Sequence, residues 1–337
     1  MALGNGEIKF SQMRDEFNGT TEVKFSQYYK GGSYVTDNNT SVPTGGQISM
    51  SQMRGAARMM FFVVSSNRKE LDVRDYVISQ GWDQQAPFEI TINAGVYCWS
   101  NSLSKGGATV SSQLTGYIKA LRNNGYIIGR GGDGGGETST NSYYNAQSGG
   151  PALVTAAIGY TIYNNSGAYI AGGGGGGGAA YGSGGGGGAG GGKGGNARTD
   201  SGSALVAGGN GGDVGKSGSR GAGYDDRGGY GGGSGGEGGS NLDRGKDANY
   251  EGAGGGGGRI LPGVGGSGAN GAGGNGGSAG NAGSSASGDA AGGGGGWGAN
   301  GGNGGRKNGG SGGRAIDWSG VAKQSFVDNG TVYGAVS

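Results

Sequence analysis

Few residues of this sequence have the chemistry of catalysis. The chain contains no histidine, which excludes a histidine-based triad and most zinc sites. Residues 215–217 read Gly-Lys-Ser, like the end of a phosphate-binding loop, but Asn210 occupies the position of that motif's first glycine. The glycine-rich residues that follow cannot form the helix that the motif also needs. We therefore expect no catalytic residue and no cofactor.

Metal and nucleic-acid sites are poorly supported as well. Asp225 and Asp226 have the chemistry to bind calcium, but one pair of carboxylates without further ligands is a weak pattern. The 25 basic and 23 acidic residues are interspersed, so the chain lacks the cationic surface that binds nucleic acid or anionic membranes. Two Arg-Gly-Gly segments resemble RNA-binding sequences, but their arginines are few and stand among acids. We expect neither a metal site nor a nucleic-acid partner.

Aromatic residues beside acids and amides are better candidates for function. Tyr and Trp give large contact areas at low entropic cost and stack on sugar rings, while neighbouring acids and amides hydrogen-bond to hydroxyls or protein loops. The three densest groups are Tyr143-Tyr144-Asn145, Tyr224-Asp225-Asp226-Arg227 and Asn249-Tyr250-Glu251. Tyr224 is the strongest candidate because its neighbours are charged, whereas Tyr143 and Tyr250 have the alternative role of covering the end of a domain. These groups predict a surface that binds carbohydrate or protein.

The elements that must position these groups are rich in glycine. Of the 96 glycines in 337 residues, 79 fall in residues 129–314, and the chain has only four prolines. In residues 273–284 the larger side chains recur every third residue, at Asn275, Ser278, Asn281 and Ser284. Polyproline-II geometry has three residues per turn and no internal hydrogen bonds, so adjacent helices of this kind must bond to each other. We therefore predict that residues 129–314 form a stacked polyglycine-II helix sandwich.

Two kinds of tract are expected in this sandwich. The glycine-only tracts 172–178, 184–188, 254–258 and 292–296 are predicted to lie inside, where backbones approach closely. Tracts with one side chain per turn are predicted to lie at the edges, with Trp297, Asn300, Asn303 and Arg306 along one edge. The mixed segments between tracts are expected to be loops that carry the candidate groups, about half of them being mere turns. Collagen is excluded because glycine fills two positions of three, and disorder is the second alternative.

The remaining residues have ordinary β-strand patterns. Residues 58–66 form an apolar run, residues 88–99 alternate in polarity, and residues 114–132 predict two strands around the turn Asn123-Asn124-Gly125. Related sequences recur at 123–132, 164–175 and 328–336, each with a turn before a short apolar strand. We predict a β framework over residues 66–128 to which residues 315–337 return, so that the glycine-rich residues 129–314 are an insertion. The predicted fold is therefore mainly β or irregular.

Residues 1–65 contain a threefold repeat. The segments EIKFSQMRDEF (7–17), EVKFSQYYKGG (22–32) and QISMSQMRGAA (47–57) align without gaps. Each predicts a short strand and then a helical turn capped by the serine of the Ser-Gln pair. Segments of this length cannot each bury a core, so we expect them to pack on one another as a self-contained module or on a partner.

The glycine-rich residues and the strand that leads into them resemble a known family. A strand through NNGYIIGRGGDGGG (123–136) and long glycine tracts broken by polar and aromatic loops are similar to the long-tail-fibre tip adhesins of T-even-like bacteriophages. The resemblance covers residues 115–337. It implies that the loops bind a host outer-surface receptor, an outer-membrane protein or a glycan, and that the N-terminal domain docks on a trimeric tail-fibre protein. The repeats depart from that family's Trp-rich attachment segment and resemble repeats of other phage virion proteins, so the expected partner of this module is a trimeric tail-fibre protein or another virion protein.

The resemblance also predicts where the protein acts. We expect a virion protein at the tail fibre tip, assembled in the reducing host cytoplasm, where the single Cys98 forms no internal disulfide. The chain has no apolar signal segment and no run of about 20 apolar residues to cross a bilayer, so no membrane insertion is expected. The residues predicted to pack inward at the fibre attachment are Phe10, Phe25 and Met50, and those predicted to contact the fibre are Arg14, Tyr29 and Arg54. The alternative is a non-adhesive structural protein, such as a capsid decoration or an ice-binding polyglycine bundle.

Overall fold

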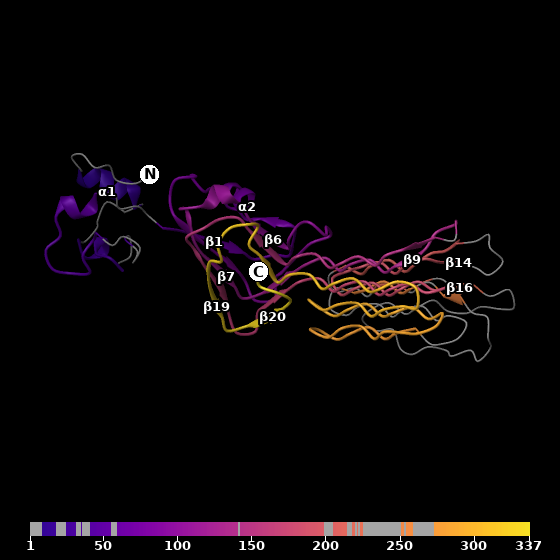
Figure 1. Ribbon diagram of the computed structural model, residues 1–337. Helices are drawn as coiled ribbons and strands as arrows, with labels where there is room; N and C mark the ends of the chain where they lie inside the picture. The colour runs from indigo at the N-terminus through magenta and orange to yellow at the C-terminus, as the bar shows by residue number, and fades with distance from the viewer. Residues whose placement is uncertain are drawn as a thin grey trace.

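The protein has three parts that follow one another in space (Figure 1). A computed structural model describes residues 9–17, 25–31, 35, 41–54, 59–140, 142–198, 205–213, 218–219, 221, 223–224, 251–252, 254–258 and 273–337. The N-terminal module (residues 9–54) lies at one end, parallel sheets form the middle, and glycine-rich tracts, here named the glycine bundle, extend away from both. The regular structure is mostly β, with few helices.

Three parallel sheets form the middle of the molecule. The first contains β1 (Met60–Val64), β4 (Phe88–Ile92), β7 (Ile118–Asn123), β12 (Thr161–Asn164) and β19 (Ser325–Asp328). The second contains β2 (Arg68–Lys69), β5 (Tyr97–Trp99), β8 (Tyr126–Ile128), β13 (Tyr169–Ala171) and β20 (Thr331–Tyr333). The third contains β3 (Leu71–Asp72), β6 (Ala108–Val110), β11 (Leu153–Thr155) and β18 (Ile316–Asp317). The chain visits the three sheets in turn on each circuit, so they are the three sides of a coil, which we call the β-solenoid.

Apolar residues on successive strands stack inside the β-solenoid. Ile90, Leu121 and Ile162 are direct partners in neighbouring strands of the first sheet, and all three are buried. Burial of each such side chain stabilises the fold by about 1.5–3 kcal/mol relative to full exposure. Phe88 and Ile92 point to the same side of β4 as Ile90 and are also buried, which confirms the alternation predicted for this strand.

A hydrogen-bonded ladder of two amides and one carboxylate forms the corner between the first and second sheets. The side chain of Asn123 donates to Asn164 Oδ1 (2.9 Å), and the side chain of Asn164 donates to Asp328 Oδ1 (2.9 Å). Both asparagines are buried, so these bonds satisfy amides that would be costly to bury unpaired. The recurring sequences at 123–132, 164–175 and 328–336 are thus the same corner on three circuits. The two strands predicted around Asn123 are present as β7 and β8, but they lie in different sheets.

Two helical segments within the β-solenoid were not expected from the sequence. They are α2 (Val73–Ser79) and the 3₁₀ turn η3 (Ser112–Leu114). Asp72 caps α2, because its Oδ1 accepts from the backbone N–H groups of Arg74 (2.9 Å) and Asp75 (3.1 Å). Aspartate is a common helix-capping residue, but residues 66–128 were predicted as a β framework.

The glycine-rich residues leave the β-solenoid at one corner. Residues 129–152 connect β8 to β11 and residues 172–315 connect β13 to β18, so both insertions replace the link between the second and third sheets. Residues 315–337 return as β18, β19 and β20, which pair with β11, β12 and β13. Because β1 pairs with β4, we propose that the N-terminal module ends before Met60 rather than at residue 65.

Successive residues of the central tract 172–178 hydrogen-bond to different neighbours. The pairs of backbone donor and acceptor, at 2.7–2.9 Å, are Gly173–Gly150, Gly176–Gln147, Gly174–Ala189, Gly177–Gly186, Gly175–Ala299 and Gly178–Gly302. Every third N–H therefore points to the same neighbouring tract, as expected for a backbone with three residues per turn. The carbonyl groups of the tract accept from three further tracts, 129–136, 292–298 and 309–314. Tract 172–178 is thus surrounded by backbone on all sides.

Close packing leaves no room for side chains on these tracts. A Cβ atom at Gly175 would lie 2.0 Å from the carbonyl oxygen of Gly310, and one at Gly294 would lie 2.1 Å from that of Gly187. The four glycine-only tracts that were predicted to lie inside are buried. Glycine is therefore required here by the distance between backbones.

Side chains spaced by three residues lie on the surface of the glycine bundle. The predicted row Asn275, Ser278, Asn281 and Ser284 is exposed, as are Asn300, Asn303 and Arg306 of the second row. A turn at residues 279–281 divides the first row. Residues 274 and 277 donate in parallel order to 291 and 294, whereas 293 and 296 donate in antiparallel order to 284 and 281. The three-residue period thus continues through a reversal of the chain.

Stacked aromatic rings join the β-solenoid to the glycine bundle. Tyr97, Tyr126 and Tyr169 stack on successive strands of the second sheet, with ring centroids 4.4 and 5.2 Å apart, and Tyr333 lies 6.3 Å from Tyr169. Trp297 of the glycine bundle is buried against Tyr169 and Tyr333. The prediction that Trp297 lies on an outer edge is therefore wrong, because a turn at residues 297–298 places the indole against the β-solenoid.

The three repeats of the N-terminal module each form a helical turn. These are α1 (Phe10–Glu16) and the 3₁₀ turns η1 (Phe25–Tyr28) and η2 (Met50–Met53). The serine does not cap the turn as predicted, because it is the second residue within it. The glutamine caps instead: Gln12 Oε1 accepts from the N–H of Lys9 (2.7 Å), and Gln52 Oε1 accepts from that of Ser49 (2.7 Å). Residues 47–49, where a strand was predicted, form none.

The core of this module uses a different repeat position from the predicted one. Met13, Tyr28 and Met53, which follow the Ser-Gln pair, are 1%, 0% and 0% exposed. Phe17, Val35 and Val42 complete this core. Met50 is 38% exposed, so its predicted inward packing is wrong. The prediction assumed strand alternation before the serine, whereas a helical turn brings the residue after the glutamine into the core. The side chains of Phe10 and Phe25 lie outside the described part of the structure.

We expect Gly175→Val to disrupt the glycine bundle. The added side chain would overlap the Gly310 carbonyl, which costs more than the roughly 1–3 kcal/mol of ordinary overpacking. Ser278→Val, at an exposed position of the same bundle, should change stability by less than about 0.5 kcal/mol. Thermal unfolding of both variants beside the unmodified protein measures the difference, and equal tolerance at the two positions would contradict the close packing of backbones.

Met53→Ala should loosen the N-terminal module and Met50→Ala should not. Removal of a fully buried Met side chain costs about 2–5 kcal/mol, whereas an exposed one costs less than about 0.5 kcal/mol. Amide hydrogen exchange of residues 9–54, measured in the full-length chain, reports the opening of this module. Similar exchange rates in the two variants would show that the residue after the glutamine does not hold the core.

Candidate functional site

The reversals of the outward-running tracts gather at the end of the glycine bundle opposite the N-terminal module, which we call the far end (Figure 1). Three reversals are marked by pairs of short antiparallel strands, here called hairpins: β9 (Gly136–Glu137) with β10 (Tyr143–Tyr144), β14 (Ala197–Arg198) with β15 (Leu205–Val206), and β16 (Gly223–Tyr224) with β17 (Glu251–Gly252). Tight turns at 181–182, 288–289 and 305–307 lie beside them. The N–H groups of Arg306 and Lys307 donate to the carbonyl of Ala179 (3.0 and 2.9 Å), and that of Gly305 donates to Ala290 (3.3 Å).

The three hairpins stand in a row. β14 contacts both β9 and β17, and Tyr144 joins the first two hairpins, because its hydroxyl accepts from the N–H of Asn196 (2.9 Å). The ring lies over Gly136, where a Cβ atom would come within 2.3 Å of the same hydroxyl. Burial raises the pKa of Tyr144. This predicted site residue is therefore half-buried and holds hairpins together.

Residues from several reversals lie near Tyr143. It pairs with Glu137 across the first hairpin. The pKa of Tyr143 is raised, first because its phenol is partly withdrawn from water and then because the Glu137 carboxylate is near. Arg306 lowers this pKa, and Tyr181 and Asp289 raise it. The phenol thus stays protonated at neutral pH and can donate a hydrogen bond, among charges of both signs from turns that are far apart in the sequence.

Tyr224 and Glu251 are direct partners across the hairpin of β16 and β17. One residue from each of two candidate groups that lie apart in the sequence is therefore paired with the other at the far end. The other predicted residues of these groups, Asp225, Asp226, Arg227, Asn249 and Tyr250, lie outside the described residues. The Gly-Lys-Ser segment 215–217 also lies outside them.

Sequence reasoning missed three residues of the far end. Tyr181 is 44% exposed at a turn, and Arg306 and Lys307 form the turn that bonds to Ala179. The signals were present: Tyr181 interrupts two glycine-only tracts, and the three-residue phase slips between Arg306 and Asn308. Both features mark a chain reversal, which places a large side chain at the end of the bundle.

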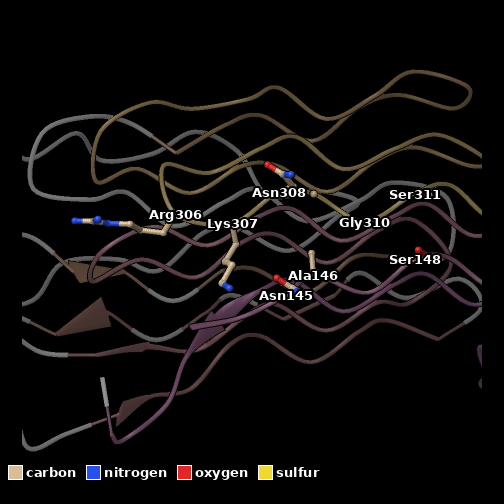
Figure 2. A pocket seen from close by; sticks show the side chains of 9 residues that line it. Asn145, Ala146, Ser148, Arg306, Lys307, Asn308, Gly310 and Ser311 are labelled. Atoms are coloured by element: carbon tan, nitrogen blue, oxygen red, sulfur yellow. The ribbon is translucent and has the colours of Figure 1, made fainter. Parts of the chain in front are cut away.

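A pocket of about 460 Å³ lies on the side of the glycine bundle, between two returning tracts (Figure 2). Asn145, Ala146 and Ser148 line one wall and residues 306–311 line the other. In Figure 2 the side chain of Lys307 extends toward the tract of Asn145, whereas Arg306 extends away from the turn. This lateral pocket contains Asn145, the third residue of the first predicted group.

A second candidate surface belongs to the N-terminal module. Arg14 and Tyr29 are half-buried, and Arg54 is exposed. Arg14 pairs with the neighbouring Asp15 (2.9 Å), and the Tyr29 hydroxyl donates to the carbonyl of Gly46. All three residues directly follow the buried core positions Met13, Tyr28 and Met53, so each repeat presents an equivalent position beside its core.

The described residues give little support for a metal site, a reactive thiol or a membrane-spanning helix. No group of three His, Cys, Asp or Glu residues that would hold a metal occurs among them. Burial raises the pKa of the Cys98 thiol to about 12, so this cysteine stays protonated and unreactive. None of the helices in the described part is long and apolar enough to span a bilayer.

Comparison with known proteins gives two findings. Residues 60–231 match the family described as phage tail fibre adhesin Gp38. The fold is similar to the crystal structure of the gp37–gp38 adhesin tip complex of the bacteriophage S16 long tail fibre, with a TM-score of 0.53 and 19% sequence identity. That similarity covers 99% of this chain and 99% of the other. No match was found among curated protein sequences.

Proposed function

We propose a binding surface for this chain, which belongs to the phage tail fibre adhesin Gp38 family and is a receptor-binding protein of the phage tail fibre. The proposed surface is the far end of the glycine bundle. The observation that carries the proposal is the gathering of three hairpins and three turns at that end. The buried tracts expose almost no side chains, so the loops must provide the varied side chains that contact a receptor.

The inferred architecture of the glycine bundle is the polyglycine-II sandwich expected from the sequence. Its support is the three-residue period of the hydrogen bonds made by tract 172–178. Further support comes from the glycine positions at which a Cβ atom would overlap neighbouring carbonyl groups. Such a bundle holds its loops on a rigid base, which reduces the entropy lost when they bind.

The chemistry of the far end suits a polar host receptor. Tyr143 and Tyr181 provide aromatic area, and Glu137 and Arg306 provide charges near Tyr143. Aromatic anchors with adaptable polar neighbours are common in binding loops. We propose an outer-membrane protein or a surface glycan as the receptor and no catalytic step. Membership of the adhesin family disfavours the alternative of a capsid decoration or an ice-binding bundle.

The N-terminal module is proposed to attach the chain to a tail-fibre protein. The solved structure that the fold resembles is a complex of gp37 with gp38, which favours a fibre protein as partner here too. Three repeats with one shared core, and with Arg14, Tyr29 and Arg54 in equivalent positions, would give one chain three similar contacts for a trimeric fibre. Attachment through this module would place the protein at the tip of the virion's tail fibre.

Loss of the far-end tyrosines should abolish adsorption to host cells. Tyr181→Ala with Tyr224→Ala removes two aromatic anchors, for which a weakening of more than about tenfold is expected, as for binding hot spots. Ile158→Ala, matched in exposure but located in the β-solenoid, should adsorb normally. Binding of the purified proteins to host cells is measured after their melting temperatures are shown to be equal. Normal adsorption of the double variant would move the receptor site away from the far end.

Charge reversal on the N-terminal module should prevent assembly without affecting the fold. Arg14→Glu with Arg54→Glu reverses the charge at two proposed contacts with the fibre. Lys69→Glu makes the same charge change at an exposed residue of the β-solenoid and serves as the control. Incorporation into tail fibres, followed by immunoblotting of purified particles, should be lost only in the first variant. Deletion of residues 1–57 provides the stricter test, since particles that still carry the truncated chain would disprove attachment through this module.

A further inference from the structure

We propose that the lateral pocket binds an acidic saccharide, a sugar chain that carries carboxylate or phosphate groups. The inference rests on the proposed receptor-binding function and names a ligand class for one part of that surface. The pocket, of about 460 Å³, is formed by residues 145–148 and 306–311 of two tracts (Figure 2). Three features of its lining carry the argument: two polar rows, two cations and the near absence of apolar side chains.

Two parallel rows of polar side chains line the pocket. Asn145 and Ser148 are three residues apart on one tract, as are Asn308 and Ser311 on the other, and all four are exposed. The two backbones touch, because the N–H of Gly149 donates to the carbonyl of Ser311 (2.8 Å). A three-residue turn repeats these groups at intervals of about 9 Å along each tract. Amides and hydroxyls both donate and accept hydrogen bonds, which matches the hydroxyl groups of a sugar chain.

Two cations follow one another at one end of these rows, and the side chain of Lys307 extends toward the tract of Asn145, whereas that of Arg306 extends away (Figure 2). The backbone N–H groups of Arg306 and Lys307 both donate to the carbonyl of Ala179, so the positions of these residues are fixed by the residue that directly follows the central tract. Neither side chain forms an ion pair within the part of the chain that the structure describes. A negatively charged group on the ligand would supply the missing partner, and hydrogen bonds from such cations to anions are stronger than neutral ones.

The lining favours a saccharide over a protein loop. Ala146 is the single apolar side chain of the pocket, and the other members are polar, charged or glycine. A protein loop gains much of its affinity by burying an apolar or aromatic centre, for which this pocket offers no counterpart. When a hydroxylated and charged sugar chain binds here, hydrogen bonds to the polar lining can replace the hydrogen bonds to water that it loses.

The test uses the full-length chain and pairs of matched oligosaccharides. Hyaluronan hexasaccharide (carboxylates) is compared with chitohexaose (neutral), and mannopentaose phosphate with mannopentaose, by saturation-transfer NMR and calorimetry. We expect binding of the acidic member of at least one pair and no binding of its neutral counterpart. Lys307→Gln should weaken that binding about tenfold, the loss expected for one charge-assisted hydrogen bond. Lys193→Gln, which removes the same charge from an exposed position elsewhere on the glycine bundle, should have no effect.

A second variant separates charge from shape. Ser311→Tyr fills the pocket without changing its charge, and it should abolish binding while the melting temperature stays unchanged. Equal binding of acidic and neutral sugars, or undiminished binding by both variants, would overturn the proposal. Tighter binding of hexaglutamate than of either acidic sugar would overturn it in favour of an acidic protein loop. Adsorption to host cells is measured in parallel: a chain that adsorbs but binds no acidic sugar retains the proposed function and loses this inference.

Discussion

In the glycine bundle, successive backbone N–H groups of the central tract donate to different neighbouring tracts. The donors of residues 173–178 reach three neighbours in rotation, and a polyproline-II-like backbone has no acceptor of its own to offer. No tract can therefore satisfy its polar groups alone, and a single unpaired buried group costs about 1–3 kcal/mol. The tracts therefore depend on one another for hydrogen bonds, and glycine is needed where two backbones approach so closely that a Cβ atom would overlap a carbonyl group. The conformational entropy lost by so many glycines is offset by bonds that every added tract completes.

The β-solenoid supplies the starting geometry for this assembly. Both glycine-rich insertions leave at the corner between the second and third sheets, on adjacent circuits whose spacing is set by parallel strand pairing. The buried ladder of Asn123, Asn164 and Asp328 fixes the preceding corner, and the stack from Tyr97 to Tyr333 continues to Trp297 of the bundle. The first tracts of the two insertions thus begin side by side at a fixed offset. Later tracts then hydrogen-bond to the backbone groups that the first tracts leave unpaired.

The sequence predicted the features that depend on local periodicity. The three-residue period identified the exposed row from Asn275 to Ser284, the glycine-only tracts identified the interior, and alternation identified β4. Predictions failed where a turn changes the surroundings of a residue. Trp297 has the right spacing for an edge but sits at a reversal, and Met50 has the pattern of a strand residue but begins a helical turn. The recurring sequences at 123–132, 164–175 and 328–336 mark one corner on three circuits, but they do not show which strands pair, so the coiling of parallel strands into a β-solenoid was not predicted.

At the far end, backbone hydrogen bonds hold the turns and hairpins in place, whereas side chains and loop lengths can differ. Arg306 and Lys307 are held through their backbone N–H groups by the Ala179 carbonyl, so the side chains can differ while the turn stays in place. A hairpin such as that of β16 and β17 is likewise fixed by pairing at its base, and the free energy of closing a longer loop rises by only about 0.6 kcal/mol for each doubling of its length. Loops of new length and composition therefore cost little stability as long as the tracts below them keep their glycines. This separation would let the proposed binding surface vary while the fold that carries it stays constant, which is a physical condition that a receptor-binding protein has to meet.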